Sequence, residues 1–215
     1  MNRTPHKAVP WTPDERRLLS SLATPAMVQD FLDSIPYTVD DRCRSPRGVM
    51  RDRTAHCMEG ALFAAAALGF HGLGARLLDL RAVRDDDHVI TVFQRRGCWG
   101  AVAKSNFVGL RYREPIHRTV RELVLGYFDD FFNTAGEKTL REHSMPFDLR
   151  RFDRRGWTTA EGDLCYIGDA LDAAPHRAVM TPAQIRGLRA VDPRALEAGL
   201  LGSDPAGLFK VTPKH

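Results

Sequence analysis

Apolar residues are most concentrated in residues 57–68, where alanine and leucine predominate and few polar side chains interrupt the run. A helix that is apolar on nearly all sides has no face to present to water, so the run predicts a central, buried helix. Glycines follow at Gly69, Gly72 and Gly74, and glycine favours the backbone conformation that ends helices.

Three shorter segments after this run have the composition of β-strands. They are residues 75–83, 89–93 and 98–103, which carry leucine, β-branched and aromatic side chains. The sequence at 95–97, Arg-Arg-Gly, is typical of a turn between the second and third segments. The pattern therefore predicts a helix followed by strands in antiparallel succession.

Further helices are expected on both sides of this core. A capping residue directly before proline marks a helix start, because the side chain accepts from free N–H groups and proline fits the first turn. The chain has this signal at Thr12, Thr24, Thr181 and Asp192. Together with helical spacing of apolar residues, it predicts helices at residues 12–22, 24–35, 119–133, 160–173, 182–189 and 193–201. Loop or mixed structure is expected at residues 37–52, 104–115 and 134–159.

These elements predict an α+β fold in which the central helix packs on a small antiparallel sheet. The 215 residues are enough for one domain of generous size, so residues 1–215 are expected to be a single domain. Its core would be residues 54–106, preceded by the helices of 12–35 and followed by a helical extension over 119–201.

Composition excludes several classes of function. Hydrophobic residues make up 43% of the chain, and no run of 18 or more apolar residues is present, so no membrane segment is expected. The polar residues 1–10 lack the apolar stretch of a signal peptide, which favours a cytoplasmic protein. The net charge is only +4 and acids interleave with the arginines, which argues against a nucleic-acid partner.

The four cysteines, Cys43, Cys57, Cys98 and Cys165, are widely scattered and form no C-x-x-C pair. A reduced cytosolic setting makes a disulfide framework improbable. A structural zinc site would need a second close-spaced pair of ligands, and none is present. We therefore expect neither a metal nor another cofactor.

Cys57 is the first residue of the predicted buried helix. The free N–H groups and the dipole of a helix N-terminus stabilise a thiolate and lower the pKa of the thiol. The sequence therefore predicts a reactive cysteine at this position. The alternative is a small buried hydrophobic residue, which describes most free cysteines.

His88 is the candidate base. It follows the acids at 85–87 and leads directly into the strand at 89–93. A histidine at the mouth of a strand can face a helix N-terminus, take the proton from Cys57 and return it to a leaving group. The alternative is a surface histidine that ends an acidic turn.

An imidazole base needs a third group that orients its ring. The strand at 98–103 ends at Lys104-Ser105-Asn106, and the amide oxygen of Asn106 can accept from the ring N–H. Ser105 is a weaker candidate, Asp79 on the preceding strand is another, and Asn106 could also be a plain turn residue.

The order of Cys57 on a helix, His88 on a strand and a Trp99-bearing strand before a polar third residue resembles the transglutaminase-like core of the papain-like cysteine enzymes, as in bacterial proteins of that type. The resemblance implies a Cys-His-Asp or Cys-His-Asn triad without a cofactor. This sequence departs from it at Ala103 and Lys104, where the aspartate is expected.

A second departure concerns the oxyanion hole. Papain-type members supply a donor from a glutamine shortly upstream of the cysteine, and residues 49–53 contain neither glutamine nor asparagine. Ser105, Trp99 and His56 are the candidates for substrate contact, although a tryptophan at such a position is more often a core residue and the alternative for His56 is a plain loop residue. The acids at 85–87 and the arginines within 42–53 could both line the cleft, which would suit a polar or zwitterionic peptide.

The sequence thus predicts a cysteine acyl-transfer enzyme that acts on a peptide or amide bond by hydrolysis or by transfer to an amine. Cys57 would attack the carbonyl, His88 would act as base and then acid, and Asn106 would orient His88. One alternative is an inactive relative that binds peptides or proteins, which the missing aspartate favours. Another is a structural protein or a nucleic-acid partner, which the arginines favour weakly.

Overall fold

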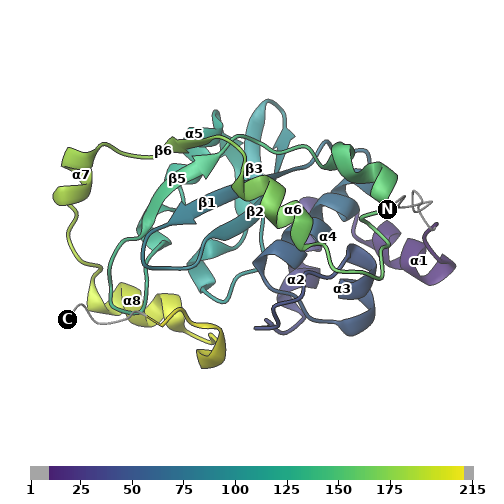
Figure 1. Cartoon of the computed structure of the whole chain (residues 1–215), viewed down its shortest axis with the longest axis horizontal. Helices are drawn as coiled ribbons and strands as arrows, with labels where there is room; N and C mark the ends of the chain where they lie inside the picture. Colours follow the sequence, from purple (N-terminus) through teal and green to yellow (C-terminus); the bar gives the residue numbers. More distant parts are fainter. Residues whose placement is uncertain (1–9, 211–215) are drawn as a thin grey trace, which may run out of the picture.

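A six-stranded antiparallel sheet forms the centre of the molecule, with the strand order β4-β3-β2-β1-β5-β6 (Figure 1). The computed structural model describes residues 10–210. The strands are β1 (Arg76–Ala82), β2 (His88–Arg95), β3 (Cys98–Val102), β4 (Arg113–His117), β5 (Leu140–Ser144) and β6 (His176–Ala178). The α+β class expected from the sequence is therefore confirmed.

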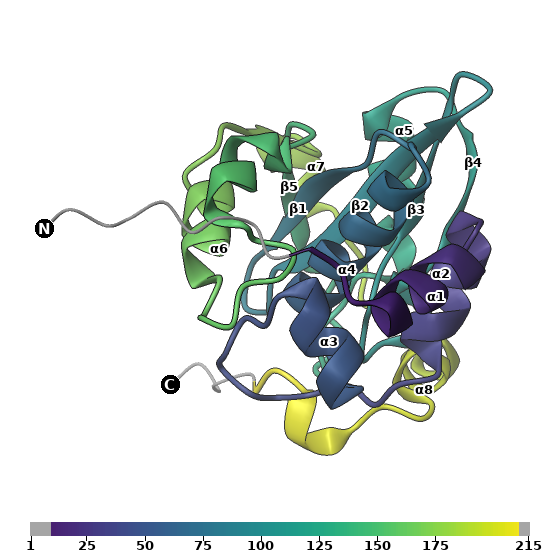
Figure 2. The ribbon, with the colours of Figure 1, turned by 90° about the vertical axis from the view of Figure 1, so that its right-hand side faces the viewer.

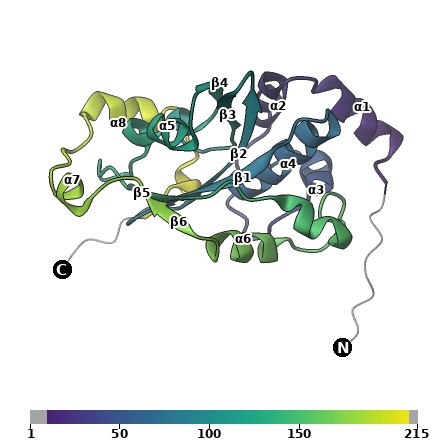
Figure 3. The same ribbon diagram turned by 90° about the horizontal axis from the view of Figure 1, so that it is seen from above.

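Helices gather at both ends of the molecule. They are α1 (Pro13–Ser21), α2 (Pro25–Asp33), α3 (Pro46–Asp52), α4 (Cys57–Phe70), α5 (Val120–Leu125), α6 (Cys165–Asp172), α7 (Pro182–Arg186) and α8 (Pro193–Leu200). Helices α1 to α4 lie at one end and α7 and α8 at the other (Figure 3). Around α4, the helices α1, α2 and α3 form a bundle on one side of the sheet (Figure 2).

The buried helix predicted from residues 57–68 is α4, and all of its residues from Met58 to Leu68 are buried. It packs on the face of the sheet that carries Phe93 and Val102. The opposite face, with Leu78 and Ile90, packs against α5. Apolar burial on every side of α4 explains why its sequence has no polar stripe.

The helix starts predicted at Thr12, Thr24, Thr181 and Asp192 are confirmed, whereas the helix expected from residue 160 begins only at Cys165. Thr12, Thr24 and Thr181 each accept a hydrogen bond from a backbone N–H two or three residues into their helix. Asp192 does the same for α8. The antiparallel succession of β1, β2 and β3 is also confirmed, with Leu80 paired to His88 across β1 and β2.

The segment expected to be a loop at 37–52 contains α3, so that prediction is wrong. Ser45 caps the helix by accepting from the N–H of Gly48, and Pro46 occupies its first turn. Ser45-Pro46 is the same signal of a capping residue before proline, but no apolar run follows this pair in the sequence.

Strands β4, β5 and β6 were missed within segments expected to be loop, mixed or helical. Most side chains of β5 are polar, and two of them, His143 and Ser144, are buried. Apolar and polar residues therefore do not alternate along this strand, and the pattern that identifies a strand is missing. The long helix expected at 119–133 ends at Leu125. Directly after it, Arg113 donates two hydrogen bonds, of 3.2 and 3.1 Å, to the carbonyl oxygen of Gly126.

All four cysteines are free, as expected. Within residues 10–210, no helix combines the length and the apolar character needed to cross a bilayer. Of the polar residues 1–10, all but Pro10 lie outside the described part of the chain.

Candidate active site

The candidate site is a cavity of about 450 Å³ at the N-terminal end of α4. Its walls come from the loop at 37–41, the first turn of α4, the start of β2, the segment at 105–110 and the C-terminal residues 206–209. In Figure 2 the yellow C-terminal end of the ribbon lies below α3. Cys57 and His88, which are 31 residues apart in sequence, both line the cavity.

Cys57 is the first residue of α4 and is half-buried. Burial of the thiol raises its pKa, but hydrogen bonds from His56 and His88 and the charges of both rings outweigh burial and lower the pKa to about 5. A thiol with this pKa is a thiolate at neutral pH. Cys57 can therefore act as the nucleophile that the sequence predicts.

His56 precedes Cys57 and is its second imidazole partner. Its Nε2 lies 3.0 Å from the carbonyl oxygen of Arg42 and must donate to it, because a carbonyl only accepts. Burial of the ring lowers its pKa, but the hydrogen bond and charge of Cys57, with Glu59 nearby, raise the pKa to about 9. His56 is thus a cation that neutralises the thiolate, a role the sequence did not suggest.

His88 is 5% exposed and stands at the start of β2. Its Nε2 lies 2.9 Å from the carbonyl oxygen of Leu110, so Nε2 carries a proton and Nδ1 is left for the thiol. The edge of the ring meets Phe131 with 6.4 Å between ring centroids. A backbone carbonyl therefore fixes the tautomer of this histidine.

Asn106 does not orient His88, so its predicted role is wrong in this structure. Its amide binds the backbone of Asp204 at both ends, with Nδ2 donating over 2.9 Å and Oδ1 accepting over 2.8 Å. Those two bonds join Asn106 to the C-terminal segment. The sequence could not foresee this because Asp204 is 98 residues away.

Of the other two residues predicted to contact substrate, one lines the cavity and one does not. Ser105 lines the cavity, and its hydroxyl accepts from the N–H of Phe107 at 3.0 Å. Trp99 lies on β3 against the apolar cluster of α5 and is not among the residues that line the cavity. It therefore follows the core alternative rather than the prediction of substrate contact.

Lys104 stands where the resemblance expects an aspartate. Its ammonium group is buried and donates to the carbonyl oxygens of Leu32 at 2.8 Å and Ile35 at 2.6 Å. The bonds cap the end of α2 and fix the chain that leads to the cavity wall at 37–41. Lys104 therefore has a structural role in this chain.

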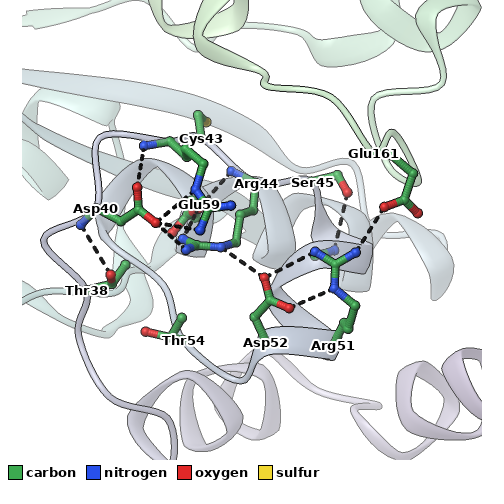
Figure 4. A network of polar contacts seen from close by, with 12 residues as sticks. Thr38, Asp40, Cys43, Arg44, Ser45, Arg51, Asp52, Thr54, Glu59 and Glu161 are labelled. Carbon is green, nitrogen blue, oxygen red and sulfur yellow. Dashed lines mark hydrogen bonds and ion pairs between the residues drawn. The ribbon is translucent and has the colours of Figure 1, made fainter.

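Glu59 and Arg44 join the first turn of α4 to the loop before α3 (Figure 4). Glu59 is fully buried and accepts from Arg44 N at 2.7 Å, from Arg44 Nη1 at 2.9 Å and from His56 N at 3.1 Å. Arg44 also pairs with Asp40 at 2.6 Å and Asp52 at 3.1 Å. The network holds His56 beside the thiol, and no spacing in the sequence pointed to Arg44.

The cavity is lined by acids and not by arginines, so the expected mixture of both is wrong. The lining acids are Asp40, Asp41, Asp85, Asp86 and Asp87. Arg42 and Arg44 pair with Asp40 instead of lining the cavity. Within residues 10–210, the carboxylates of Asp41 and Asp86 have no hydrogen bond or ion pair. Burial and the charge of Asp87 raise the pKa of Asp86.

One group of acids among the described residues has the spacing of metal ligands. Carboxylate oxygens of Asp79, Asp87 and Asp172 lie within 4.8 Å of one another. Arg81 lies 3.9 Å from Asp87 and 4.0 Å from Asp172, and His176 lies 2.9 Å from Asp79. Arg81 already supplies positive charge to Asp87 and Asp172, and Asp79 hydrogen-bonds to His176, so the group fits an internal network of polar contacts.

No protein-family model matches the sequence, and a search of curated proteins finds no match.

Proposed function

We propose that this protein is a cysteine acyl-transfer enzyme of transglutaminase-like type that acts on a peptide or amide bond. The observation that carries the proposal is the thiol of Cys57 at a helix N-terminus, in a cavity that His56 and His88 also line and where both imidazoles lower its pKa. A structural cysteine needs none of these features. The helix followed by antiparallel strands also supports the resemblance in fold.

In the proposed reaction, His88 Nδ1 takes the proton of the Cys57 thiol, and Sγ attacks the carbonyl carbon of the substrate and forms a tetrahedral oxyanion. His88 then gives a proton from Nδ1 to the leaving amine as the C–N bond breaks, which leaves an acyl thioester. Water or a second amine attacks the thioester while His88 takes its proton, and the thiolate leaves. His56 stabilises the thiolate before the attack and again when the thiolate leaves.

The acids that line the cavity favour a substrate with positive charge near the scissile bond. A cation beside Asp41 or Asp86 would gain an ion pair that neither carboxylate has within residues 10–210. An acidic substrate would face repulsion from the same groups. A lysine or arginine residue on the acyl side is therefore the best candidate.

The experiment is hydrolysis of benzyloxycarbonyl-lysine p-nitroanilide by the full chain, followed through release of p-nitroaniline. Hydroxylamine added as acceptor reports transfer as a hydroxamate. Cys57→Ala should abolish release, and Cys98→Ala is the matched control because Cys98 is half-buried on β3 and does not line the cavity. Equal release by Cys57→Ala and the unaltered protein would contradict the proposal.

The second candidate is an inactive relative that binds peptides through the same cavity. The observation in its favour is that His88 donates to the backbone carbonyl of Leu110 and not to a side-chain acid or amide. Binding of a lysine-containing peptide by calorimetry without any turnover, and with equal affinity for Cys57→Ala, would favour this candidate.

A further inference from the structure

Acyl transfer by Cys57 requires two donors for the oxyanion of the tetrahedral intermediate. The backbone N–H of the nucleophile is one of them. The second has no counterpart at residues 49–53, where papain-type enzymes place a glutamine. A hydroxyl group close to the N–H of Cys57 would meet the same need.

Tyr37 places such a hydroxyl there. It lines the cavity together with Cys57, and its phenol oxygen lies on the side of the ring near the backbone N–H of Cys57. An oxyanion bound to that N–H therefore lies within reach of the Tyr37 O–H. Burial and the charge of Cys57 raise the pKa of the phenol, so the hydroxyl keeps the proton that it must donate.

The backbone of Tyr37 is fixed relative to Cys57. Tyr37 forms a parallel bridge with Ala55, in which Ala55 N donates to Pro36 O at 3.4 Å and Thr38 N donates to Ala55 O at 3.3 Å. Ala55 is two residues before the nucleophile. The bridge therefore sets the tyrosine and the cysteine side by side.

The ring of Tyr37 is held from its other side by the C-terminal segment. A Cβ on Gly207 would lie 3.0 Å from Asn106 Nδ2 and 3.2 Å from two carbons of the ring, so the glycine backbone packs directly against both residues. Asn106 anchors this segment through its two hydrogen bonds to Asp204. Asn106 is thus a positioning residue for the tyrosine, not for His88.

We infer that Tyr37 is a catalytic residue whose hydroxyl donates the second hydrogen bond to the oxyanion, beside the N–H of Cys57. The inference rests on the proposed acyl transfer by Cys57. It assigns the donor that the sequence lacks upstream of the cysteine, and it gives residues 204–207 a function in holding that donor.

The test compares two reactions of the same thiol in Tyr37→Phe. Acylation by p-nitrophenyl acetate passes through an oxyanion, whereas alkylation by iodoacetamide displaces iodide and forms none. Both rates are measured at pH 8, where the thiolate is fully formed. Tyr112→Phe is the control, because Tyr112 does not line the cavity.

We expect Tyr37→Phe to slow acylation about 100-fold, the usual effect of losing one oxyanion donor, and to leave alkylation within about twofold. Gly207→Ala, which presses on the ring, should slow acylation in the same selective way. Equal acylation rates in Tyr37→Phe and the unaltered protein would overturn the inference. An equal fall in both reactions would also overturn it, because the tyrosine would then act on the thiol itself or on the fold.

Failure of the proposed function would look different. The unaltered protein would be alkylated at Cys57 but would release p-nitrophenol no faster than Cys57→Ala does. In that case the thiol is reactive without catalysing acyl transfer, and the question of a second donor does not arise.

Discussion

Replacement of His56 by asparagine tests the charge that stabilises the nucleophile. Asparagine is a good residue for the N-cap of a helix, so α4 should keep its start. The variant removes the cation with its pKa of about 9 and leaves His88 with its bond to Leu110. Any change in Cys57 then reports the lost imidazole.

The size of the effect follows from the pKa of Cys57. Burial alone would raise that pKa above 9.0, and hydrogen bonds from His56 and His88 bring it to about 5 instead. If the histidines share the effect equally, losing one raises the pKa by about 2, which is about 3 kcal/mol in favour of the neutral thiol. The sign is upward, because a cation that favoured the thiolate has gone.

A rate at a single pH would hide this change. At pH 6 the thiolate fraction would fall from roughly 90% to roughly 10%. A thiolate with a pKa higher by about 2 is also about tenfold more nucleophilic, which compensates for the loss. The informative quantity is therefore the midpoint of the pH profile.

The assay is the rate of iodoacetamide alkylation of Cys57 from pH 4 to 10, read by peptide mass spectrometry. We expect the midpoint near pH 5 in the unaltered protein and near pH 7 in His56→Asn, with a higher plateau. His71→Asn is the control, because His71 caps the opposite end of α4. An unchanged midpoint in His56→Asn would refute the assignment of His56 as the charge partner.

Three further predictions concern the network, the packing and the cavity. Glu59→Gln should lower the free energy of unfolding in urea by about 2 kcal/mol, because it removes the fully buried one of the three carboxylates that pair with Arg44; a loss under 1 kcal/mol would contradict this. Gly60→Ala should cost about 2 kcal/mol in the same assay, since its Cβ would lie 2.3 Å from Lys104 Cβ; a more stable variant would disprove the close contact. Asp86→Asn should lower the preference for the lysine anilide over the glutamate anilide about fivefold; an unchanged ratio would exclude Asp86 from substrate binding.

The sequence predicted the elements that are determined by their own apolar pattern and by hydrogen bonds between neighbouring residues. Helix α4 is surrounded by apolar neighbours, so its apolar run was sufficient to place both the helix and Cys57 at its start. The helix starts at Thr12 and Thr24 depend only on local hydrogen bonds. Elements of this kind can be identified from a window of a few residues.

The parts that the sequence did not predict depend on distant partners. Strand β5 is polar and forms because β1 and β6 pair with it on both sides. The bond of His88 to Leu110 uses a backbone carbonyl, which every residue has, so no side chain could reveal it. Asn106 looked like an orienting residue because its chemistry suits that role, but the backbone of Asp204 was the partner that the fold brought to it.

The most direct test of the account is a search for the acyl-enzyme on Cys57. The full chain is mixed with benzyloxycarbonyl-lysine p-nitrophenyl ester, quenched in acid and digested. We predict close to one acyl group per molecule, on Cys57 alone, removable by hydroxylamine as a thioester is. An acyl group spread over Cys43, Cys98 and Cys165, or its absence from Cys57, would contradict the claim that this thiol is the nucleophile.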